Sequence, residues 1–477
     1  MQAVKQHMLS FFDLKHPYLT RHLIAYIGNK RALLGFLHYA VSRICNDLDQ
    51  ERVVFLDPFA GSGAVARLAR LMGLKVLAND WEFYSYIINR AHLAVNAGEA
   101  AELFADRGGY EGIFSFLNNL SPPPETERYI SRYYSPQDTA AADYRRERLF
   151  YTLENGLRID GLRSKIEELY PGFAQEESNS RSSSSSSSSR SRRRRIEKEL
   201  LLASLLYQCA THTNTSGVFK ACHKGFGGHG KDALKRIMEP IHLEMPVLID
   251  SPERTEVFRL DAAQFLSGRS GDICYIDPPY NQHQYGSNYH LLNTIALWDK
   301  PAADIEFNTA GVLKNKAAIR RDWVKTKSPY CYKESAPEAF RMLLSSIDCR
   351  YLMVSYNTEG IIPFGELTDM LASQGRVDLF TSDYIKYKGG KQSISRKVNN
   401  LEFLLVVDRK KRSNQASRAR VADLLVSKKL TMLLKSSFNP GRVVEYFTTQ
   451  DSWLVIESRE GRDILLPMPH LYRLDQG

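Results

Sequence analysis

The sequence predicts an α/β fold in which a doubly wound, Rossmann-like sheet is interrupted by a largely helical insertion. Three observations predict it. Apolar runs of strand length occur before residue 100 and after residue 250, residues 51–97 have a strand–turn–helix–strand pattern, and residues 101–250 show helical spacing with many arginines. Parallel strands joined by a helix belong to doubly wound sheets, which bind ligands at the carboxyl ends of their strands.

The first unit consists of two strands around a glycine turn. Its expected elements are a strand at residues 52–56, a turn at 57–63, a helix at 64–72 ended by Gly73, and a strand at 75–78. Asn79 and Asp80 follow that second strand and therefore lie at its carboxyl end. Further strands are expected at residues 256–260, 273–276, 351–355 and 401–407.

Changes of pattern divide the chain into four parts. These are a first sheet half at residues 1–100, the helical insertion at 101–250, a second sheet half at 251–411 and a small appended α+β module at 412–477. Within the insertion, residues 178–195 contain eight consecutive serines followed by arginines, so we expect a disordered loop there. That loop is either a solvated insertion or an electrostatic tether for phosphates.

The composition favours a nucleic-acid-binding protein of the cytoplasm. The 477 residues carry a formal net charge of +10, which suggests an acidic partner. The six cysteines form no CxxC pair and match no zinc finger, so we expect neither disulfides nor a metal. No apolar stretch reaches the length of a membrane span, and the N-terminus lacks a signal-peptide pattern, so no membrane partner is expected. The oligomeric state stays open.

The most informative residues are Asp277-Pro278-Pro279-Tyr280, which follow an apolar run of strand type. An acid, two prolines and an aromatic ring at a strand's carboxyl end form a narrow, rigid pocket. The Asp277 carboxylate and the Pro278 carbonyl can accept hydrogen bonds from one amino group, while the Tyr280 ring stacks on the ring system carrying it. A planar base with an exocyclic amine fits this pocket, and adenine fits best.

The glycine turn points to a second ligand. Gly61 and Gly63 let the backbone approach a ligand closely, and the following helix offers its positive N-terminus. The turn lacks the Lys-Ser/Thr of a P-loop and the order of the dinucleotide fingerprint. Asp80 can bind two ribose hydroxyls, with a helix N-cap as the structural alternative. A ribose ligand without a phosphate requirement points to S-adenosylmethionine.

Four motifs in order resemble those of a known family. Tyr26-Ile27-Gly28-Asn29-Lys30, the turn at 57–63, Asn79-Asp80 and Asp277-Pro278-Pro279-Tyr280 resemble the motifs of adenine-N6 DNA methyltransferases of the Dam-like alpha class. That class includes the methylases of type II restriction-modification systems. Residues 284–292 and 355–357 also resemble a subgroup of it, and the resemblance covers roughly residues 20–407.

The resemblance implies a Rossmann-like, S-adenosylmethionine-dependent, site-specific DNA adenine methyltransferase. Its partner is double-stranded DNA, and a cognate restriction endonuclease is a candidate second partner. The implied cofactor-binding residues are Tyr26, Lys30, Asp57, Phe59, Gly61, Gly63, Asp80, Asp261 and Asp277. Asp80 would bind the ribose, and Asp261 would lie near the cofactor's adenine unless it is only a helix cap. The implied catalytic residues are Asp277, Pro278 and Tyr280.

The expected reaction is direct methyl transfer. An adenine amine is a poor nucleophile because its lone pair is delocalised into the ring. Asp277 and the Pro278 carbonyl would accept its two N–H bonds, which draws the nitrogen toward tetrahedral geometry and exposes the lone pair to the methyl group. The base has to leave the duplex, and Tyr280 is the expected stacking platform for it.

Contacts with DNA are expected from the insertion and from the segment after Tyr280. The expected residues are Arg158, Arg163, Asn214, Lys220, Tyr285, Asn288 and Lys388. Arginine and asparagine can read guanine and adenine edges, and Lys388 suits a phosphate better than a base. The structural alternative for each is an ordinary solvated polar residue.

Rival functions differ at a few positions. RNA adenine-N6 methylation is the main alternative, because the pocket would contact only the base. Cytosine-N4 methylation and protein glutamine methylation usually place Ser or Asn where this chain has Asp277. A non-catalytic nucleic-acid-binding protein on the same fold predicts loss of Asp277 or of the glycine turn, and both are intact.

Overall fold

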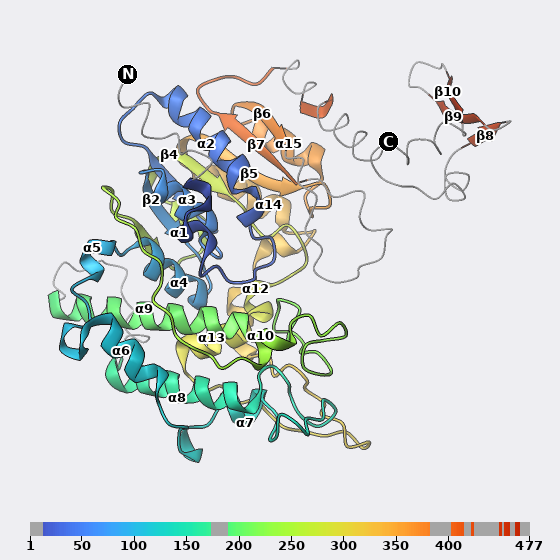
Figure 1. Ribbon diagram of the computed structural model, residues 1–477. Coiled ribbons are helices and arrows are strands. Elements are labelled where there is room, and N and C mark those ends of the chain that lie inside the picture. Colours follow the sequence, from blue (N-terminus) through green and yellow to red (C-terminus); the bar gives the residue numbers. More distant parts are fainter. Residues whose placement is uncertain are drawn as a thin grey trace.

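The computed structural model describes residues 13–172, 189–381, 402–414, 421–423, 448–450, 453–457 and 463–467. A seven-stranded, mostly parallel sheet with helices packed against it forms the centre, which confirms the predicted α/β fold (Figure 1). The strand order is β3-β2-β1-β4-β5-β7-β6. The order reverses between β1 and β4, and that is where a doubly wound sheet opens a crevice for ligands.

The five parallel strands lie close to the predicted positions. The strands of the sheet are β1 (Val54–Asp57), β2 (Lys75–Asn79), β3 (Glu256–Phe258), β4 (Ser270–Ile276), β5 (Asp348–Asn357), β6 (Arg376–Thr381) and β7 (Glu402–Asp408). Strand β7 pairs antiparallel with both β5 and β6. Strand β6 was not predicted, because a short edge strand that is half polar gives no continuous apolar run.

Successive residues of the central strands enter two different cores. Phe55 and Ile273 pack with the first group of helices, whereas Leu56 and Cys274 pack with the second, as the period of two in a strand requires. The first group is α2 (Leu34–Leu48), α3 (Ala64–Leu71) and α4 (Phe83–Leu93). The second group is α11 (Ala262–Leu266), α14 (Ala336–Ser345) and α15 (Phe364–Ala372).

The insertion is largely helical, as expected, and it shares its core with the sheet. Its helices are α6 (Gly109–Asn118), α7 (Ile130–Tyr134), α8 (Leu153–Leu169), α9 (Ser189–Thr211) and α10 (Leu234–Met238), and the short α5 (Ala97–Ala100) directly precedes it. Helix α9 packs against α4, α8 and α13 (His290–Leu297), so residues of both parts belong to one hydrophobic core (Figure 1). The remaining α-helices are α1 (Pro17–Thr20) and α12 (Tyr285–Asn288).

Short 3-10 helices complete the connections. They are Asp13–Lys15, Arg31–Leu33, Ala105–Arg107, Glu125–Glu127, Arg321–Thr326 and Pro329–Cys331. The last two lie between α13 and α14 and approach the carboxyl edge of the sheet, where residues from both line a pocket. These irregular segments therefore contribute to the site that the sheet builds.

The end of the serine–arginine segment differs from the prediction. Residues 189–195 were expected in a disordered loop, but they form the first turns of α9. Arg193 pairs with Glu197 one turn later, with Nε 3.2 Å from Oε1, and Arg194 donates to the Leu169 carbonyl at the end of α8. These contacts give the arginines helical partners that a solvated loop lacks. Residues 178–188 lie outside the described residues.

Near the C-terminus, three short strands form a separate antiparallel sheet in the order β10-β9-β8. They are β8 (Thr448–Gln450), β9 (Trp453–Glu457) and β10 (Asp463–Pro467). The three strands belong to the segment that was predicted as an appended module, and most of that module lies outside the described residues. Within the described ranges, no helix is both long and apolar enough to span a bilayer.

A buried arginine binds the N-terminal segment to helix α3. Arg67 of α3 is 1% exposed, and its guanidinium donates to the carbonyls of Tyr18, Arg21 and His22 over 3.1–3.3 Å. Burial lowers the Arg67 pKa to about 10, which still leaves the side chain charged at neutral pH. The segment that carries Tyr26 is thereby held against α3, which begins at the glycine turn.

Arg163 was expected to contact DNA, but the structure places its side chain inside the protein. Its side chain is fully buried, and it donates to the carbonyls of Ile295 and Ala296 at 2.8 and 3.1 Å. A third bond reaches Glu167 at 2.7 Å, and the guanidinium lies 5.5 Å from the Trp298 ring centroid. Arg163 therefore caps the end of α13 and ties the insertion to the second sheet half.

We expect Arg163→Ala to lower the free energy of unfolding by about 3–5 kcal/mol, because it leaves two buried carbonyls without their donor and removes the ion pair with Glu167. Arg146→Ala, at an exposed position on the same insertion, is the matched control and should change it by less than about 0.5 kcal/mol. Thermal and urea denaturation measure both. Unchanged stability together with lost DNA binding would restore the DNA-contact assignment.

Candidate active site

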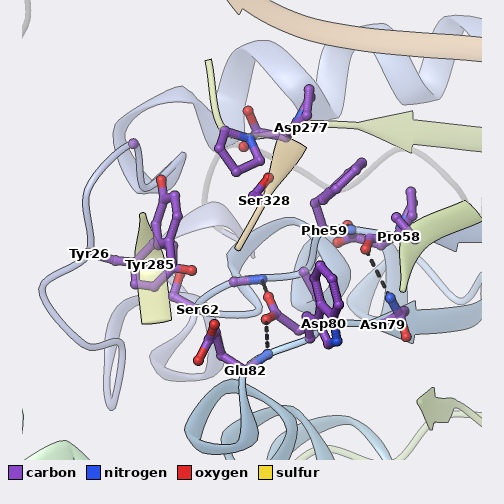
Figure 2. A pocket seen from close by; sticks show the side chains of 18 of the residues that line it. Tyr26, Pro58, Phe59, Ser62, Asn79, Asp80, Glu82, Asp277, Tyr285 and Ser328 are labelled. Carbon is purple, nitrogen blue, oxygen red and sulfur yellow. Dashed lines mark hydrogen bonds between the residues drawn. The ribbon is translucent and has the colours of Figure 1, made fainter. Parts of the chain in front are cut away.

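A pocket opens at the carboxyl ends of β1, β2 and β4, at the switch point of the sheet. It brings together residues from six stretches of the sequence, between residues 26 and 330. Its lining includes Tyr26, Lys30, Asp57, Phe59, Gly61, Asp80, Asp261, Asp277, Pro278, Tyr280 and Tyr285. Every predicted cofactor and catalytic residue except Gly63 thus lines one pocket, and Figure 2 shows the labelled side chains of this set around it.

The glycine turn forms one wall of the pocket. Gly61 and Gly63 have φ angles of +51° and +80°, which disfavour any residue with a β-carbon. A β-carbon on Gly61 would lie 2.8 Å from the Tyr26 ring, so the turn also needs the space. The Gly61 carbonyl accepts bonds from Ser85 at 2.6 Å and Asn89 at 3.1 Å, which fixes the turn to α4.

Asp80 links the end of β2 to the glycine turn. Its Oδ2 accepts from the Gly61 amide at 2.8 Å and its Oδ1 from the Glu82 amide at 2.9 Å (Figure 2). Burial raises the Asp80 pKa, and these amide bonds counteract part of that rise. Asp80 is therefore a preorganised carboxylate whose remaining lone pairs can receive ligand hydroxyls.

The pocket is rich in carboxylates. Its lining contains five acids and one lysine, which are Asp57, Asp80, Glu82, Asp261, Asp277 and Lys30. Asp57 is 1% exposed, and its Oδ2 has no hydrogen-bond partner among the described residues. Burial and the nearby Asp277 raise the Asp57 pKa well above its usual range. A pocket of this kind suits a positively charged ligand, because a cation would offset the repulsion between the acids.

Lys30 contacts both the first and the last residue of the motif Asp277-Pro278-Pro279-Tyr280. It is 3% exposed, with Nζ 3.1 Å from Asp277 Oδ1 and 3.4 Å from the Tyr280 hydroxyl. Burial raises the Asp277 pKa to about 6, and the ammonium of Lys30 opposes that rise. Asp277 is thus a carboxylate that is ionised at neutral pH and close to titration.

An aromatic cluster holds the loop that carries Lys30. The Tyr26 ring stacks on Tyr289 at a centroid distance of 5.0 Å, and Tyr285 lies equally close to it. The Tyr285 hydroxyl donates to the Ile27 carbonyl at 3.0 Å, and the Ile27 amide donates to the Tyr289 hydroxyl at 2.8 Å. Tyr285, expected to contact DNA, is instead part of the pocket wall that positions residues 26–30.

Two predicted cofactor residues have additional structural roles. Asp261 accepts from the amides of Ala263 and Gln264, so it caps α11 as its structural alternative required, and it also lines the pocket. Phe59 lines the pocket with its ring perpendicular to Tyr330, at a centroid distance of 5.4 Å. Gly63 lies at the N-terminus of α3, behind the lining residues.

Several residues at the site were missed in the sequence. Glu82 follows Asp80 by two positions, lines the pocket and accepts from Asn293 at 2.5 Å, and burial raises its pKa to about 7. Ser328 lines the pocket, and its backbone forms two hydrogen bonds with the side chain of Gln284. Glu402 contacts Tyr280 and Lys30 from β7. Only Glu82 could have been found, from its position beside Asp80.

Three further residues that were expected to contact DNA lie partly or wholly inside the protein, and within the described chain only Arg158 and Asn214 have hydrogen-bond partners there for their side chains. Arg158 is half-buried and donates to the carbonyls of Ile241 and Asn118. Asn214 is fully buried between the Leu149 carbonyl and the Gly227 amide, and Asn288 is 1% exposed. In this conformation none of the three presents its polar group to DNA. Lys220 is exposed, and Lys388 lies outside the described residues.

The comparisons with known proteins agree with this site. Residues 26–334 match the family model of the D12 class N6 adenine-specific DNA methyltransferases. The chain is 30% identical over 391 residues to the type II methyltransferase M.NlaIII of Neisseria lactamica, covering 80% of this chain and 99% of that protein. No solved structure matches the chain.

Two further relatives extend the pattern. The type II methyltransferase M.CviAII of Paramecium bursaria Chlorella virus 1 is 27% identical, over 81% of this chain and 99% of that protein. The modification methylase LlaI of Lactococcus lactis subsp. lactis is 30% identical over 81% of this chain, which spans only 55% of that relative. None of these comparisons supports the RNA alternative.

The motifs that suggested the resemblance lie within the matched region and converge on one pocket. That region extends over more than half of the chain and includes the loop with Lys30, the glycine turn, Asp80 and Asp277. The enzyme activity that these residues were expected to carry is the activity of the matching family. The chain belongs to the D12 class of N6 adenine-specific DNA methyltransferases.

Proposed function

We propose that the protein transfers a methyl group from S-adenosylmethionine to the N6 amine of a flipped adenine within a specific sequence of double-stranded DNA. The observation that carries this proposal is the convergence of Asp277, Pro278 and Tyr280 with the glycine turn and Asp80 on one acidic pocket. The names of the relatives, which are type II methyltransferases and modification methylases, support a role as the modification half of a restriction-modification system. A cognate endonuclease is then the second partner.

The pocket residues fit S-adenosylmethionine. The cofactor supplies an electrophilic methyl group on a positively charged sulfur. Asp80 would accept from the ribose hydroxyls with the lone pairs that its two amide bonds leave unused. Asp57, which has an unpartnered carboxylate oxygen, would face the cationic part of the cofactor. Phe59 and Tyr26 give the aromatic walls, and Asp261 lies at the rim formed by α11.

The target amine would be bound by Asp277 and Pro278. The Pro278 carbonyl follows directly on Asp277, so both oxygens lie at the end of β4 and can accept the two N–H bonds of one amine. This arrangement orients the nitrogen lone pair toward the methyl group and stabilises the developing positive charge on nitrogen. The ring of Tyr280 lines the same pocket, where it can stack on the flipped base.

We expect Asp277→Asn to lower the single-turnover methylation rate by about 100-fold or more, because the amine loses a charged acceptor in the transition state. Incorporation of tritium from labelled S-adenosylmethionine into plasmid DNA and into RNA, followed by nucleoside chromatography, measures it. Asp348→Asn, at the exposed start of β5, is the matched control and should keep the wild-type rate. Wild-type label in RNA and not in DNA adenine contradicts the proposal.

The rate should also depend on pH in a defined direction. Asp277 must be ionised to accept the amine, and its pKa is raised to about 6, so the single-turnover rate should fall about tenfold per unit as pH drops below 6. Above that pH the rate should be constant. If the rate falls at low pH in the wild type but not in Glu82→Gln, the titrating group is Glu82, whose pKa is about 7.

A second cleft, next to the pocket, suits the DNA backbone. It has a volume of about 340 Å³ and shares Asn29 and Ser62 with the lining of the active-site pocket. Arg31, Arg236 and three threonines line it, and no acid occurs among its described lining residues. Arg236 is half-buried and forms neither an ion pair nor a hydrogen bond within the described chain. A phosphate beside the flipped nucleotide would give this arginine a partner.

We expect Arg236→Ala to weaken DNA binding and to reduce the slope of log affinity against log salt by about 1, because one phosphate contact is lost. Lys235→Ala is the matched control, since that neighbouring side chain is 91% exposed and pairs with Glu239. Fluorescence anisotropy with duplex DNA over a salt series measures both variants. Equal effects of the two substitutions would remove the cleft from the DNA interface.

A further inference from the structure

Glu402 reaches the active site through the topology of the sheet. It is the first residue of β7, where it pairs with Asn357, the last residue of β5. Because β7 runs antiparallel to β5, its beginning lies at the edge where β4 and β5 end. A residue more than a hundred positions after Asp277 is thereby placed next to the motif that binds the target amine.

The contacts of Glu402 form a closed network with two residues of the pocket. Its Oε1 accepts from the Tyr280 hydroxyl at 3.3 Å, and its Oε2 lies 3.8 Å from Lys30 Nζ. Lys30 in turn donates to the Tyr280 hydroxyl at 3.4 Å and pairs with Asp277 at 3.1 Å. One buried ammonium is therefore shared between two carboxylates and one hydroxyl.

The two carboxylates hold Lys30 unequally. Asp277 is within hydrogen-bond distance of Lys30 Nζ. Glu402 Oε2 is buried and has no hydrogen-bond partner among the described residues. Its distance of 3.8 Å from Nζ permits an ion pair with Lys30 but no hydrogen bond. A small displacement of the ammonium toward Glu402 would give this oxygen its missing donor. The same displacement would release Asp277 Oδ1 for the amine of the target base.

We propose that Glu402 is a positioning residue that holds Tyr280 and takes over Lys30 when the target amine binds Asp277. The proposal rests on the proposed function, because it concerns the same reaction. Without the Glu402 charge, Lys30 has Asp277 as its only carboxylate neighbour in the network and competes with the amine for it. Glu402 does not line the pocket, so its effect on the reaction passes through Lys30 and Tyr280.

The test is Glu402→Gln, which keeps the shape and loses the charge. We expect the single-turnover rate at saturating DNA and cofactor to fall about 10- to 100-fold, the range expected for a charged hydrogen-bonded group. We expect the acid limb of the pH–rate profile, the range in which the rate falls as pH drops, to move to lower pH. The Glu402 charge raises the Asp277 pKa, so the loss of that charge lowers the Asp277 pKa. The other titratable groups facing Asp277 are Lys30, Asp57, Tyr275, Tyr280 and Tyr285.

Three further measurements make the result decisive. Glu402→Asp should restore most of the rate, and the double variant with Lys30→Met should lose much less than the sum of the two single losses, since Glu402 and Lys30 act within one network. Binding of S-adenosylhomocysteine, measured by calorimetry, should stay within about threefold of wild type, because Glu402 does not line the pocket. Asp378→Asn, an exposed acid on β6, is the matched control and should match wild type in every measurement.

A purely structural role predicts a lower melting temperature with an unmoved acid limb, and that result overturns the proposal. Additive losses in the double variant, or a Glu402→Gln rate within about twofold of wild type, overturn it as well. Failure of the proposed function would be seen separately, as the absence of label on DNA adenine in the wild-type protein. The Glu402 result is read only from the ratio of variant to active wild type.

Discussion

The buried ammonium of Lys30 is the constraint on which the active site depends. A lysine that is 3% exposed needs carboxylates within a few ångströms, and here they are Asp277 at 3.1 Å and Glu402 at 3.8 Å. These acids lie at the end of β4 and the start of β7, whereas the lysine precedes the first strand of the sheet. Pairing the Lys30 charge therefore holds the N-terminal loop with Lys30 against the edge of the sheet where Asp277 lies.

The rest of the fold supports that closure. Arg67 binds three carbonyls of residues 18–22 and sets the direction from which the loop with Lys30 approaches. Tyr285 and Tyr289 then hold Ile27 through one hydrogen bond each. The insertion contributes indirectly, since α9 packs against α13, the helix that follows these tyrosines. Helices that the sequence suggests as a separate recognition region thus also stabilise the active-site wall.

The sequence predicted the sheet and the pocket well because their signals are local. Glycine at positive φ, an acid after a strand and the Asp277–Tyr280 motif each carry their own chemistry, and all line or border one pocket. The expected DNA contacts that lie inside the protein share another feature. Arg163 and Asn214 look like DNA readers, but their partners are backbone carbonyls from distant elements, which no local pattern reveals. The sequence likewise gives no sign of the position of Glu402, because a glutamate before an apolar strand is common.

The concentration of acids explains how the pocket can distinguish the proposed cofactor from its product. Burial raises the pKa values of Asp57 and Asp80, because a buried carboxylate is costly to keep ionised without a cation nearby. S-adenosylmethionine carries a positive charge on sulfur, and the product left after methyl transfer does not. The electrostatic gain from these acids is therefore larger before the reaction than after it, which favours exchange of product for a new methyl donor.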